Sequence, residues 1–314
     1  MQDGIKENMF ISGFSTVRNG IKLGYPLVES IRSILPVVDE FVITIGKSDD
    51  NTLKTVKRIG DPKIKVLETT WDSRFTVKGR ILAVQSNLAL FQCTGTWAFY
   101  IQADEVFHED DHNRIVKFCE NYSKDEEVEG FLFDYTHFFG NYSWYGDSYH
   151  WYRKEIRVIR NHRGIISWRS AQSFRVDGRK IGVVDTGCRI FHYGWVRPPK
   201  VMAEKIKQHD ELHHGRGYNK NIHQMDYNYL NEMDTKCMKP FNGKHPKVMT
   251  DIIKGYNIDF DPSSIQYKPN MKDLRRRVVN KLGKCTGWYP GEYKNYKKLK
   301  LKQSDRVQII KSDH

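Results

Sequence analysis

Residues 97–107 read WAFYIQADEVF. Two adjacent carboxylates, Asp104 and Glu105, follow an apolar run there, and side chains of this type in this position could take part in chemistry. The run Trp97–Ile101 is aromatic and apolar, which is typical of a buried central strand. Asp104 and Glu105 come just after it, where open α/β sheets bind ligands. Because buried carboxylates are costly unless they are paired, we predict that they hold a hard divalent cation, Mg²⁺ or Mn²⁺, together with a diphosphate. The alternative is that they cap the helix expected a few residues later.

The elements that must position these carboxylates alternate between strand and helix. Apolar and β-branched runs predict strands, and apolar residues at helical spacing predict helices between them. Such alternation indicates a parallel sheet with right-handed crossovers, here a Rossmann-like nucleotide-binding half over about residues 9–107. Neither a GxGxxG nor a GxxxxGK[ST] motif is present, which argues against dinucleotide and P-loop sites. We expect strands at 9–17, 40–45, 64–68 and 97–101, and helices at 23–35, 52–59 and 77–92.

The pattern changes after residue 107. An aromatic, turn-rich stretch at 139–152 suits a substrate-facing region, which defines an acceptor half over about residues 108–215. Residues 1–215 are thus expected to form one domain, and 216–314 a basic, mostly helical C-terminal extension. We expect strands at 130–138, 155–160 and 189–195, and helices at 111–122, 200–212, 224–233 and 273–282.

Composition places the chain among globular proteins. It has 314 residues, of which 39% are hydrophobic and 13% aromatic. No apolar run approaches the roughly 20 residues that span a bilayer, and the opening lacks the pattern of a secretory signal. Five scattered cysteines without CxxC spacing indicate reduced thiols rather than a zinc site. We therefore predict a soluble, cytoplasmic protein.

Positive charge is concentrated near the C-terminus. The net charge is +13, and residues 271–314 hold 13 lysines and arginines against 4 acidic residues. Such a tail predicts contact with nucleic acid, with an anionic substrate, or with an anionic membrane at its inner face. The alternative is a solvated face. A second hypothesis of function is therefore a nucleic-acid-binding protein, whose affinity would fall steeply with salt.

Motifs across about residues 9–212 resemble family 2 glycosyltransferases of the GT-A fold. IGKSDDNT at 45–52 is similar to that family's DDGSxDxT-like loop, and QSNLA at 85–89 is similar to its ARNxG-like signature. IQADEVF matches the family's LDADDVL, which places Asp104 on the metal-binding Asp of the DxD motif and Gln102 on the first Asp. HFFGNYSWYGDSYHWYRKEIRVIR and FHYGWVRPPKVMAEK are similar to a bacterial branch involved in cell-surface polysaccharide and lipopolysaccharide-core assembly.

The resemblance implies a GT-A-like, Rossmann-type mixed α/β sheet flanked by helices. It also implies a glycosyltransferase that moves a sugar from a UDP-, GDP- or dTDP-sugar to a hydroxyl of a glycan or glycolipid, in polysaccharide biosynthesis. Transfer would be metal-dependent and inverting, with Mn²⁺ or Mg²⁺ neutralising the leaving diphosphate. Gln102 is a poorer metal ligand than Asp. The family's later catalytic acid aligns near Gln172, which cannot act as a base, so the base must lie elsewhere.

These arguments assign roles to particular side chains. The open alternatives are a core histidine for His192, an Asx turn for Asp147 and a buried core for the aromatic residues. The predicted roles are donor binding by Val17, Ser48, Asp50, Lys78, Arg80, Gln102 and Asp104; metal binding by Asp104 and His192; general base by Asp147, followed by Asp134 and Glu155; and acceptor binding by Trp144, Tyr145, Trp151 and Arg153.

Two rival enzymes remain. A glycosyltransferase acting on modified nucleic acid bases would combine the domain with the basic tail, although no nucleic-acid recognition motif is present. A nucleotidyltransferase on a related fold would need a Gly-rich loop after its first strand, and Gly13-Phe14-Ser15-Thr16 lacks that pattern.

Overall fold

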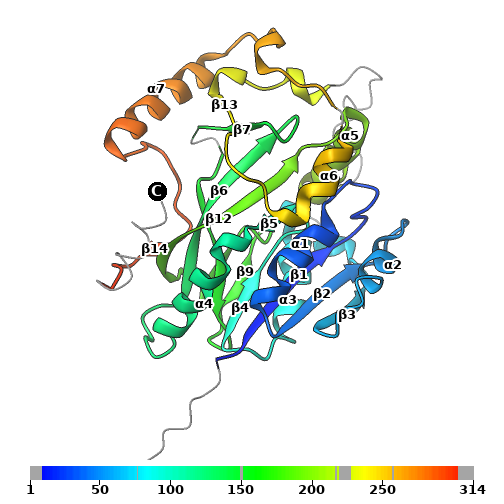
Figure 1. The fold of residues 1–314 in the computed structure, drawn as a ribbon, viewed down its shortest axis with the longest axis vertical. Helices are drawn as coiled ribbons and strands as arrows, with labels where there is room; N and C mark the ends of the chain where they lie inside the picture. The colour runs from blue at the N-terminus through cyan, green and yellow to red at the C-terminus, as the bar shows by residue number, and fades with distance from the viewer. Residues whose placement is uncertain are drawn as a thin grey trace, which may run out of the picture.

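The computed structural model describes residues 9–75, 77–148, 151–215, 218, 228–256 and 258–302. The start of the helix predicted at 224–233 and the basic tail beyond residue 302 lie outside these residues. Figure 1 shows the arrangement of the chain around a central twisted sheet.

Within the described ranges, eleven strands form one mixed sheet and three form a smaller one. The main path runs β13-β7-β6-β8-β4-β1-β2-β3, with β12 against β5, β6 and β14, and the small sheet runs β11-β10-β9. The strands are β1 Ile11–Val17, β2 Glu40–Gly46, β3 Ile64–Thr69, β4 Trp97–Tyr100, β5 Glu105–Phe107, β6 Gly130–Phe139, β7 Trp144–Gly146, β8 Lys154–Arg160, β9 Ile166–Trp168, β10 Ser173–Val176, β11 Arg179–Lys180, β12 Gly182–Trp195, β13 Met238–Pro240 and β14 Lys297–Lys298.

Helices cover the sheet, and short 3₁₀ turns connect several elements. None of the described helices is long and apolar enough to span a bilayer. The α-helices are α1 Leu27–Ile34, α2 Thr52–Lys57, α3 Arg80–Leu90, α4 His112–Asn121, α5 Pro199–His214, α6 Thr250–Gly255 and α7 Met271–Thr286.

The nucleotide-binding half has the predicted order and direction. β1 pairs in parallel with β2 and β4, and β2 pairs in parallel with β3. β8 then adds to β4 in the antiparallel direction, which makes the sheet mixed. The predicted α/β class with a mixed sheet flanked by helices is therefore confirmed. The parallel strands bring their carboxyl ends to one edge, where Asp104 follows β4.

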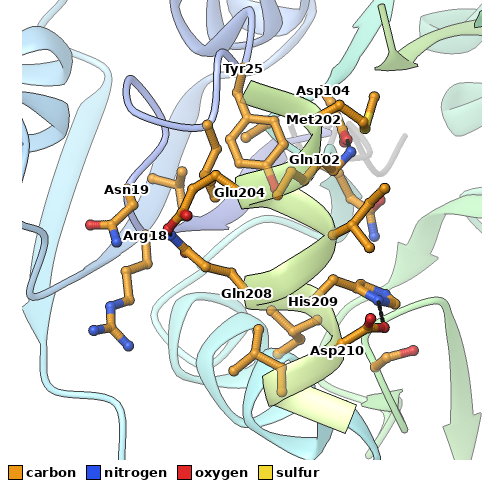
Figure 2. Close-up of a pocket in the computed structure, with 18 of the residues that line it drawn as sticks. Arg18, Asn19, Tyr25, Gln102, Asp104, Met202, Glu204, Gln208, His209 and Asp210 are labelled. Carbon is orange, nitrogen blue, oxygen red and sulfur yellow. Dashed lines mark hydrogen bonds and ion pairs between the residues drawn. The ribbon is translucent and has the colours of Figure 1, made fainter. Parts of the chain in front are cut away.

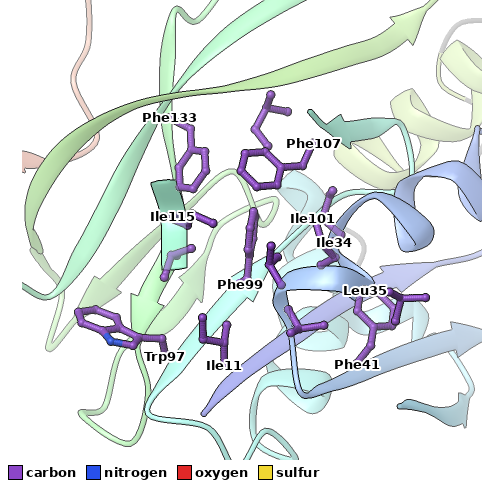
Figure 3. Packing of buried hydrophobic residues seen from close by; sticks show 14 of the residues in the cluster. Ile11, Ile34, Leu35, Phe41, Trp97, Phe99, Ile101, Phe107, Ile115 and Phe133 are labelled. Carbon is purple, nitrogen blue, oxygen red and sulfur yellow. The ribbon is translucent and has the colours of Figure 1, made fainter. Parts of the chain in front are cut away.

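Two apolar layers hold the sheet between helices. On one face, α1 and α4 pack on the sheet through Ile31, Ile34, Ile115 and Phe118. Figure 3 shows Trp97, Phe99, Phe107 and Phe133 within this layer. On the other face, α3 and the small sheet cover Phe14, Tyr100 and Leu132. Each β4 side chain is buried because both faces of that strand are covered, as its continuous apolar run predicts.

The C-terminal residues return to the main sheet. β13 pairs with β7, and β14 pairs in parallel with the start of β12. The described part of the extension therefore contributes two short strands as well as the helices α6 and α7.

Candidate active site

A cavity of about 1220 Å³ opens at the carboxyl ends of β1 and β4. One wall is the loop after β1, which carries Arg18 and Asn19, and the facing wall is helix α5. Figure 2 shows Glu204, Gln208, His209 and Asp210 along α5, with Arg18 and Asn19 across from them. This is the position at which open α/β sheets bind their ligands.

The two carboxylates after β4 have different partners. Glu105 is fully buried and receives two hydrogen bonds from Arg157, Nη2 to Oε1 at 2.7 Å and Nε to Oε2 at 2.9 Å. The Tyr135 hydroxyl donates to the same carboxylate at 2.8 Å. Glu105 is thus a structural anion inside the protein. Asp104 instead lines the cavity, so of the two only Asp104 can meet a ligand.

Three cationic or titratable side chains converge on Asp104 Oδ2. Lys205 Nζ lies 3.0 Å away, His192 Nε2 3.6 Å and Arg197 Nη2 3.9 Å. Burial alone would raise the pKa of Asp104, but Lys205, His192 and Arg197 hold this pKa well below its usual range. Burial and the nearby Arg197 lower the pKa of Lys205 to about 8, against the opposing effect of Asp104. The site therefore concentrates positive charge around a single ionised carboxylate.

A chain of hydrogen bonds orients His192. His137 Nε2 lies 2.8 Å from the carbonyl oxygen of Tyr152, and His137 Nδ1 lies 2.9 Å from His192 Nδ1. Because a carbonyl only accepts, His137 must donate through Nε2 and accept through Nδ1. His192 consequently donates through Nδ1, and its Nε2 faces Asp104 and the cavity. Burial holds the pKa of His137 well below its usual value, so the His137 ring is neutral within this series of hydrogen bonds.

Arg197 is fixed in place but keeps one donor unused. Its Nε donates to the carbonyl of Leu23 at 2.6 Å, and Nη1 donates to the carbonyls of Tyr193 and Gly194. Among the described residues, its buried Nη2 has no hydrogen-bond partner. Arg197 is not among the residues that line the cavity, and the anion that faces its Nη2 is Asp104 Oδ2, 3.9 Å away. Arg197 therefore acts on the site through Asp104, whose pKa it helps to lower.

The loop after β1 is shaped by two residues predicted to bind the donor. Ser48 Oγ accepts from the backbone N–H of Asn19 at 3.0 Å, and Asp50 Oδ2 accepts from that of Lys22 at 2.7 Å. Neither Ser48 nor Asp50 lines the cavity. They act on it through the loop that presents Arg18, whose guanidinium carbon lies 5.6 Å from the ring centroid of Trp71.

The other predicted donor residues divide into two groups. Val17, Gln102 and Asp104 line the cavity, as does His192. Gln102 Nε2 donates to the carbonyl of Ala171 at 3.3 Å, which leaves its amide oxygen available. The exposed Lys78 and Arg80 lie outside the cavity lining, so their donor role stays a prediction.

The three predicted bases lie outside the cavity lining. Asp147 pairs with Lys239 at 2.8 Å and with Lys284, and Asp134 pairs with Lys154 at 2.5 Å. Glu155 lines a second cavity of about 400 Å³. Its burial raises its pKa to about 7, and its Oε2 has no hydrogen-bond partner among the described residues. Catalysis by any of the three stays a prediction.

The predicted acceptor residues are mainly packed against other parts of the chain. Trp151 is buried and its ring stacks on His137, with ring centroids 5.3 Å apart. Trp144 and Tyr145 lie in β7 and pack partly against apolar clusters. Arg153 pairs with Glu292 and lies over the ring of Tyr289. Their contact with an acceptor stays a prediction.

Sequence reasoning missed the side chains that α5 contributes. Lys205 of α5 and Arg197 just before this helix both lie within the FHYGWVRPPKVMAEK segment, but a lysine in a polar helix gives no signal of its target. Asp210, also on α5, lines the cavity with His209 Nδ1 4.0 Å from its Oδ1. Only the fold brings α5 across the end of β4.

Asp104 and His192 fit as two ligands of a divalent cation. Both atoms face the cavity, and the Nδ1 proton of His192 is held by a second imidazole, an arrangement common for metal-binding histidines. In the structure, however, the Lys205 ammonium contacts the same carboxylate oxygen. Lys205 and a cation would therefore compete for Asp104. A separate cluster, His108, Glu109 and Asp110, is the one group of three potential ligand residues among the described residues, and it lies outside the cavity lining.

No family model matches the chain, and no curated protein matches it. Solved structures with a related arrangement include S. aureus TarS, with 14% identity and a TM-score of 0.40 over 64% of this chain and 39% of that chain. Another is glucosyl-3-phosphoglycerate synthase from Mycobacterium tuberculosis in complex with Mn²⁺, UDP and phosphoglyceric acid, with 17% identity and a TM-score of 0.29 over 41% and 44% of the two chains.

A third is the mannosyltransferase PcManGT from Pyrobaculum calidifontis in complex with GDP-Man and Mn²⁺, with 20% identity and a TM-score of 0.31 over 39% and 34% of the two chains. The matches span less than two thirds of the length of these proteins. At these scores the likeness assigns no activity to this chain.

Proposed function

We propose that this chain is a glycosyltransferase that moves a sugar from a nucleotide sugar to a hydroxyl of a glycan or glycolipid. The observation that carries the proposal is Asp104 in the cavity at the end of β4, with Lys205 and His192 beside it in the cavity lining and the buried Arg197 3.9 Å from it. A site with this charge suits a ligand that brings several negative charges, as a diphosphate does. The motif resemblance around IQADEVF supports the same reading.

The donor is proposed to lie between the loop after β1 and α5. Lys205 Nζ would neutralise the diphosphate, since it belongs to the cavity lining and is held beside Asp104. Trp71 and Arg18 offer a planar surface for the nucleotide base, because aromatic rings and guanidinium groups both stack on flat rings. A UDP-, GDP- or dTDP-sugar fits this description equally.

Asp104 and His192 are proposed as the ligands of Mn²⁺ or Mg²⁺. When bound, such a cation would act as a Lewis acid that neutralises the diphosphate leaving group. In the structure, the Lys205 ammonium lies beside Asp104 Oδ2. The protein's own part is to keep that carboxylate ionised and to hold Nε2 of His192 toward the cavity.

Transfer is proposed to proceed by a single displacement with inversion. The acceptor oxygen forms a bond to the anomeric carbon, the bond from that carbon to the phosphate oxygen breaks, and the nucleoside diphosphate leaves with the electron pair. The acceptor proton passes to a carboxylate base. Asp210 is our candidate from the cavity lining, because its side chain is 18% exposed whereas that of Glu204 is 35% exposed.

Thermal shifts test the donor first. UDP-, GDP-, dTDP- and CMP-sugars are added to the full chain, each with and without Mn²⁺, because a ligand that binds only the folded state raises the melting temperature. We expect one nucleotide class to raise it and Asp104→Asn to abolish the shift. Asp177→Asn is the matched control, since Asp177 is exposed and Asn tolerates its positive φ of 48°.

Radiolabelled transfer to an isolated glycan or glycolipid then tests the reaction with the nucleotide class that bound. Asp210→Asn should retain the thermal shift and lose transfer. Absence of a shift with every nucleotide sugar would refute the proposed function.

A further inference from the structure

Helix α7 turns a mainly polar side toward the protein, on which Val279 is also buried. Asp273 and Asn280 are buried on this side, and Asn280 Nδ2 donates to the backbone carbonyl of Asp147 at 2.6 Å. On the same helix, Arg277 makes two hydrogen bonds to Asp234, at 2.7 and 2.6 Å. These contacts fix the rotation of the helix about its own axis, so the side chains it exposes are determined.

The exposed side of α7 is apolar. Met271, Leu274, Val278 and Leu282 follow one another at steps of three, four and four residues, which places them on one stripe. All four are exposed, Met271 by 80% and Val278 by 69%. In an ordinary surface helix such a stripe faces the core. Here the relationship is reversed, so the stripe is available to a partner.

Lysines and arginines border the stripe. Lys272, Arg275 and Lys281 are exposed on the same helix. The C-terminal segment at 271–302 holds 11 lysines and arginines against the two acidic residues Asp273 and Glu292. Trp288 is exposed one turn beyond the stripe. Figure 1 shows α7 in orange along the outer edge of the molecule, away from the main body of the sheet.

We propose that α7 is a surface-binding helix for membranes that contain anionic lipid. Its apolar stripe would enter the boundary between headgroups and acyl chains, while the bordering cations pair with lipid phosphates. At 16 residues α7 is shorter than the roughly 20 residues that cross a bilayer, so it lies on the membrane rather than through it. Nucleic acid would use the cations but has no need of the stripe, which is why we favour lipid.

The test is flotation of the full chain with vesicles. Phosphatidylcholine vesicles are compared with vesicles in which a third of the lipid is phosphatidylglycerol, at low and high salt. We expect binding to the anionic vesicles only, weakened by salt. The double variant Met271→Ser/Val278→Ser should lower binding at least tenfold with little change in melting temperature, because both side chains are exposed. Phe91→Ser is the control, since Phe91 is 64% exposed at the end of α3.

The charge variant Arg275→Gln/Lys281→Gln should lower binding to anionic vesicles at low salt. The proposal is overturned if the wild-type chain does not float, or if Met271→Ser/Val278→Ser floats like the wild type. It is equally overturned if the stripe variant instead abolishes self-association without lipid, which would show that a second copy covers α7. Binding of RNA or DNA, lost only in the charge variant and without vesicle binding, would assign the cations to nucleic acid. None of these outcomes depends on the proposed transferase activity.

Discussion

Arg157 and Glu105 form a fully buried, two-point ion pair one residue beyond the cavity carboxylate. This pair holds the chain just after β4, and so it fixes where Asp104 projects. Arg157 also lies near the rings of Tyr100 and Tyr135, 5.4 and 5.2 Å from their centroids. The position of Asp104 in the cavity therefore depends on the Arg157–Glu105 ion pair, which does not itself have to contact a ligand.

Removing Arg157 should destabilise the fold strongly. Arg157→Met leaves the Glu105 carboxylate buried without its counter-ion, which costs about 3–5 kcal/mol in the free energy of unfolding. Urea unfolding measures the loss. The control is Arg163→Met, because the Arg163–Glu126 pair is exposed and pairs of that kind contribute about 0–1 kcal/mol. The double variant Arg157→Met/Glu105→Gln should recover part of the loss. Equal effects of the two single Arg variants would contradict this account.

Glu155 should make stability depend on pH. Its folded-state pKa is raised to about 7 from 4.5, chiefly by burial, so the folded state binds the proton more tightly than the unfolded state. Stability then falls as pH rises through the window from about 4.5 to about 7. We expect Glu155→Gln to be more stable than the wild type at pH 8, by up to about 3 kcal/mol, and the gain to vanish at pH 4.

Denaturant unfolding at pH 4, 6 and 8 measures this dependence for Glu155→Gln. The exposed Glu127→Gln provides the same loss of charge without burial. A gain that is the same at all three pH values, or that also occurs in Glu127→Gln, would refute a titrating Glu155.

Lys205 should compete with metal for Asp104. Because Lys205 Nζ contacts Asp104 Oδ2 at 3.0 Å, removing it leaves the carboxylate open to a cation. We expect Lys205→Ala to bind Mn²⁺ at least tenfold more tightly than the wild type in calorimetric titration without nucleotide, a difference of about 1.4 kcal/mol. Lys200→Ala, an exposed position on the same helix, should match the wild type. Unchanged Mn²⁺ affinity in Lys205→Ala would mean that the two cations do not share a site.

Gly194 should be intolerant of any side chain. A Cβ there would lie 2.3 Å from Cε1 of His192 and 3.0 Å from Oδ2 of Asp104, both of which must then shift. We expect Gly194→Ala to destabilise the fold by about 1–3 kcal/mol and to weaken the nucleotide-sugar thermal response at least tenfold. Gly255→Ala is the control, because beyond its own helix and chain neighbours no atom of the described residues lies within 4 Å of its Cβ position. A normal thermal response in Gly194→Ala would show that the cavity adjusts freely.

The sequence predicted the central elements well because their signals are local. Strands β1 to β4 and helices α3 and α4 lie within a few residues of their predicted ranges, since each has a strong period or a continuous apolar run. The small sheet was missed because β9 and β11 have only three and two residues, too few to show alternation. The extent of β12 was underestimated, since Gly182–Cys188 mixes polar residues with apolar ones.

In the candidate site too, residues that belong to a local motif could be predicted, whereas contacts between distant elements could not. Asp104 and His192 could be found because each belongs to a recognisable local motif, and the structure brings them within 3.6 Å. Lys205 is 101 residues from Asp104, and nothing in its own helix indicates that contact. Asp147 has a local sequence that suits a turn, but its lysine partners come from β13 and α7. Contacts between distant elements are decided by packing, which a single sequence does not display.

The pairing of β14 with β12 has a consequence for synthesis on the ribosome. Gly182 and Val183 gain their partners on one side only when Lys297 and Lys298 emerge. Until then the nascent chain presents an open strand edge, and such edges recruit other chains. That edge gains its partner only after more than a hundred further codons have been translated.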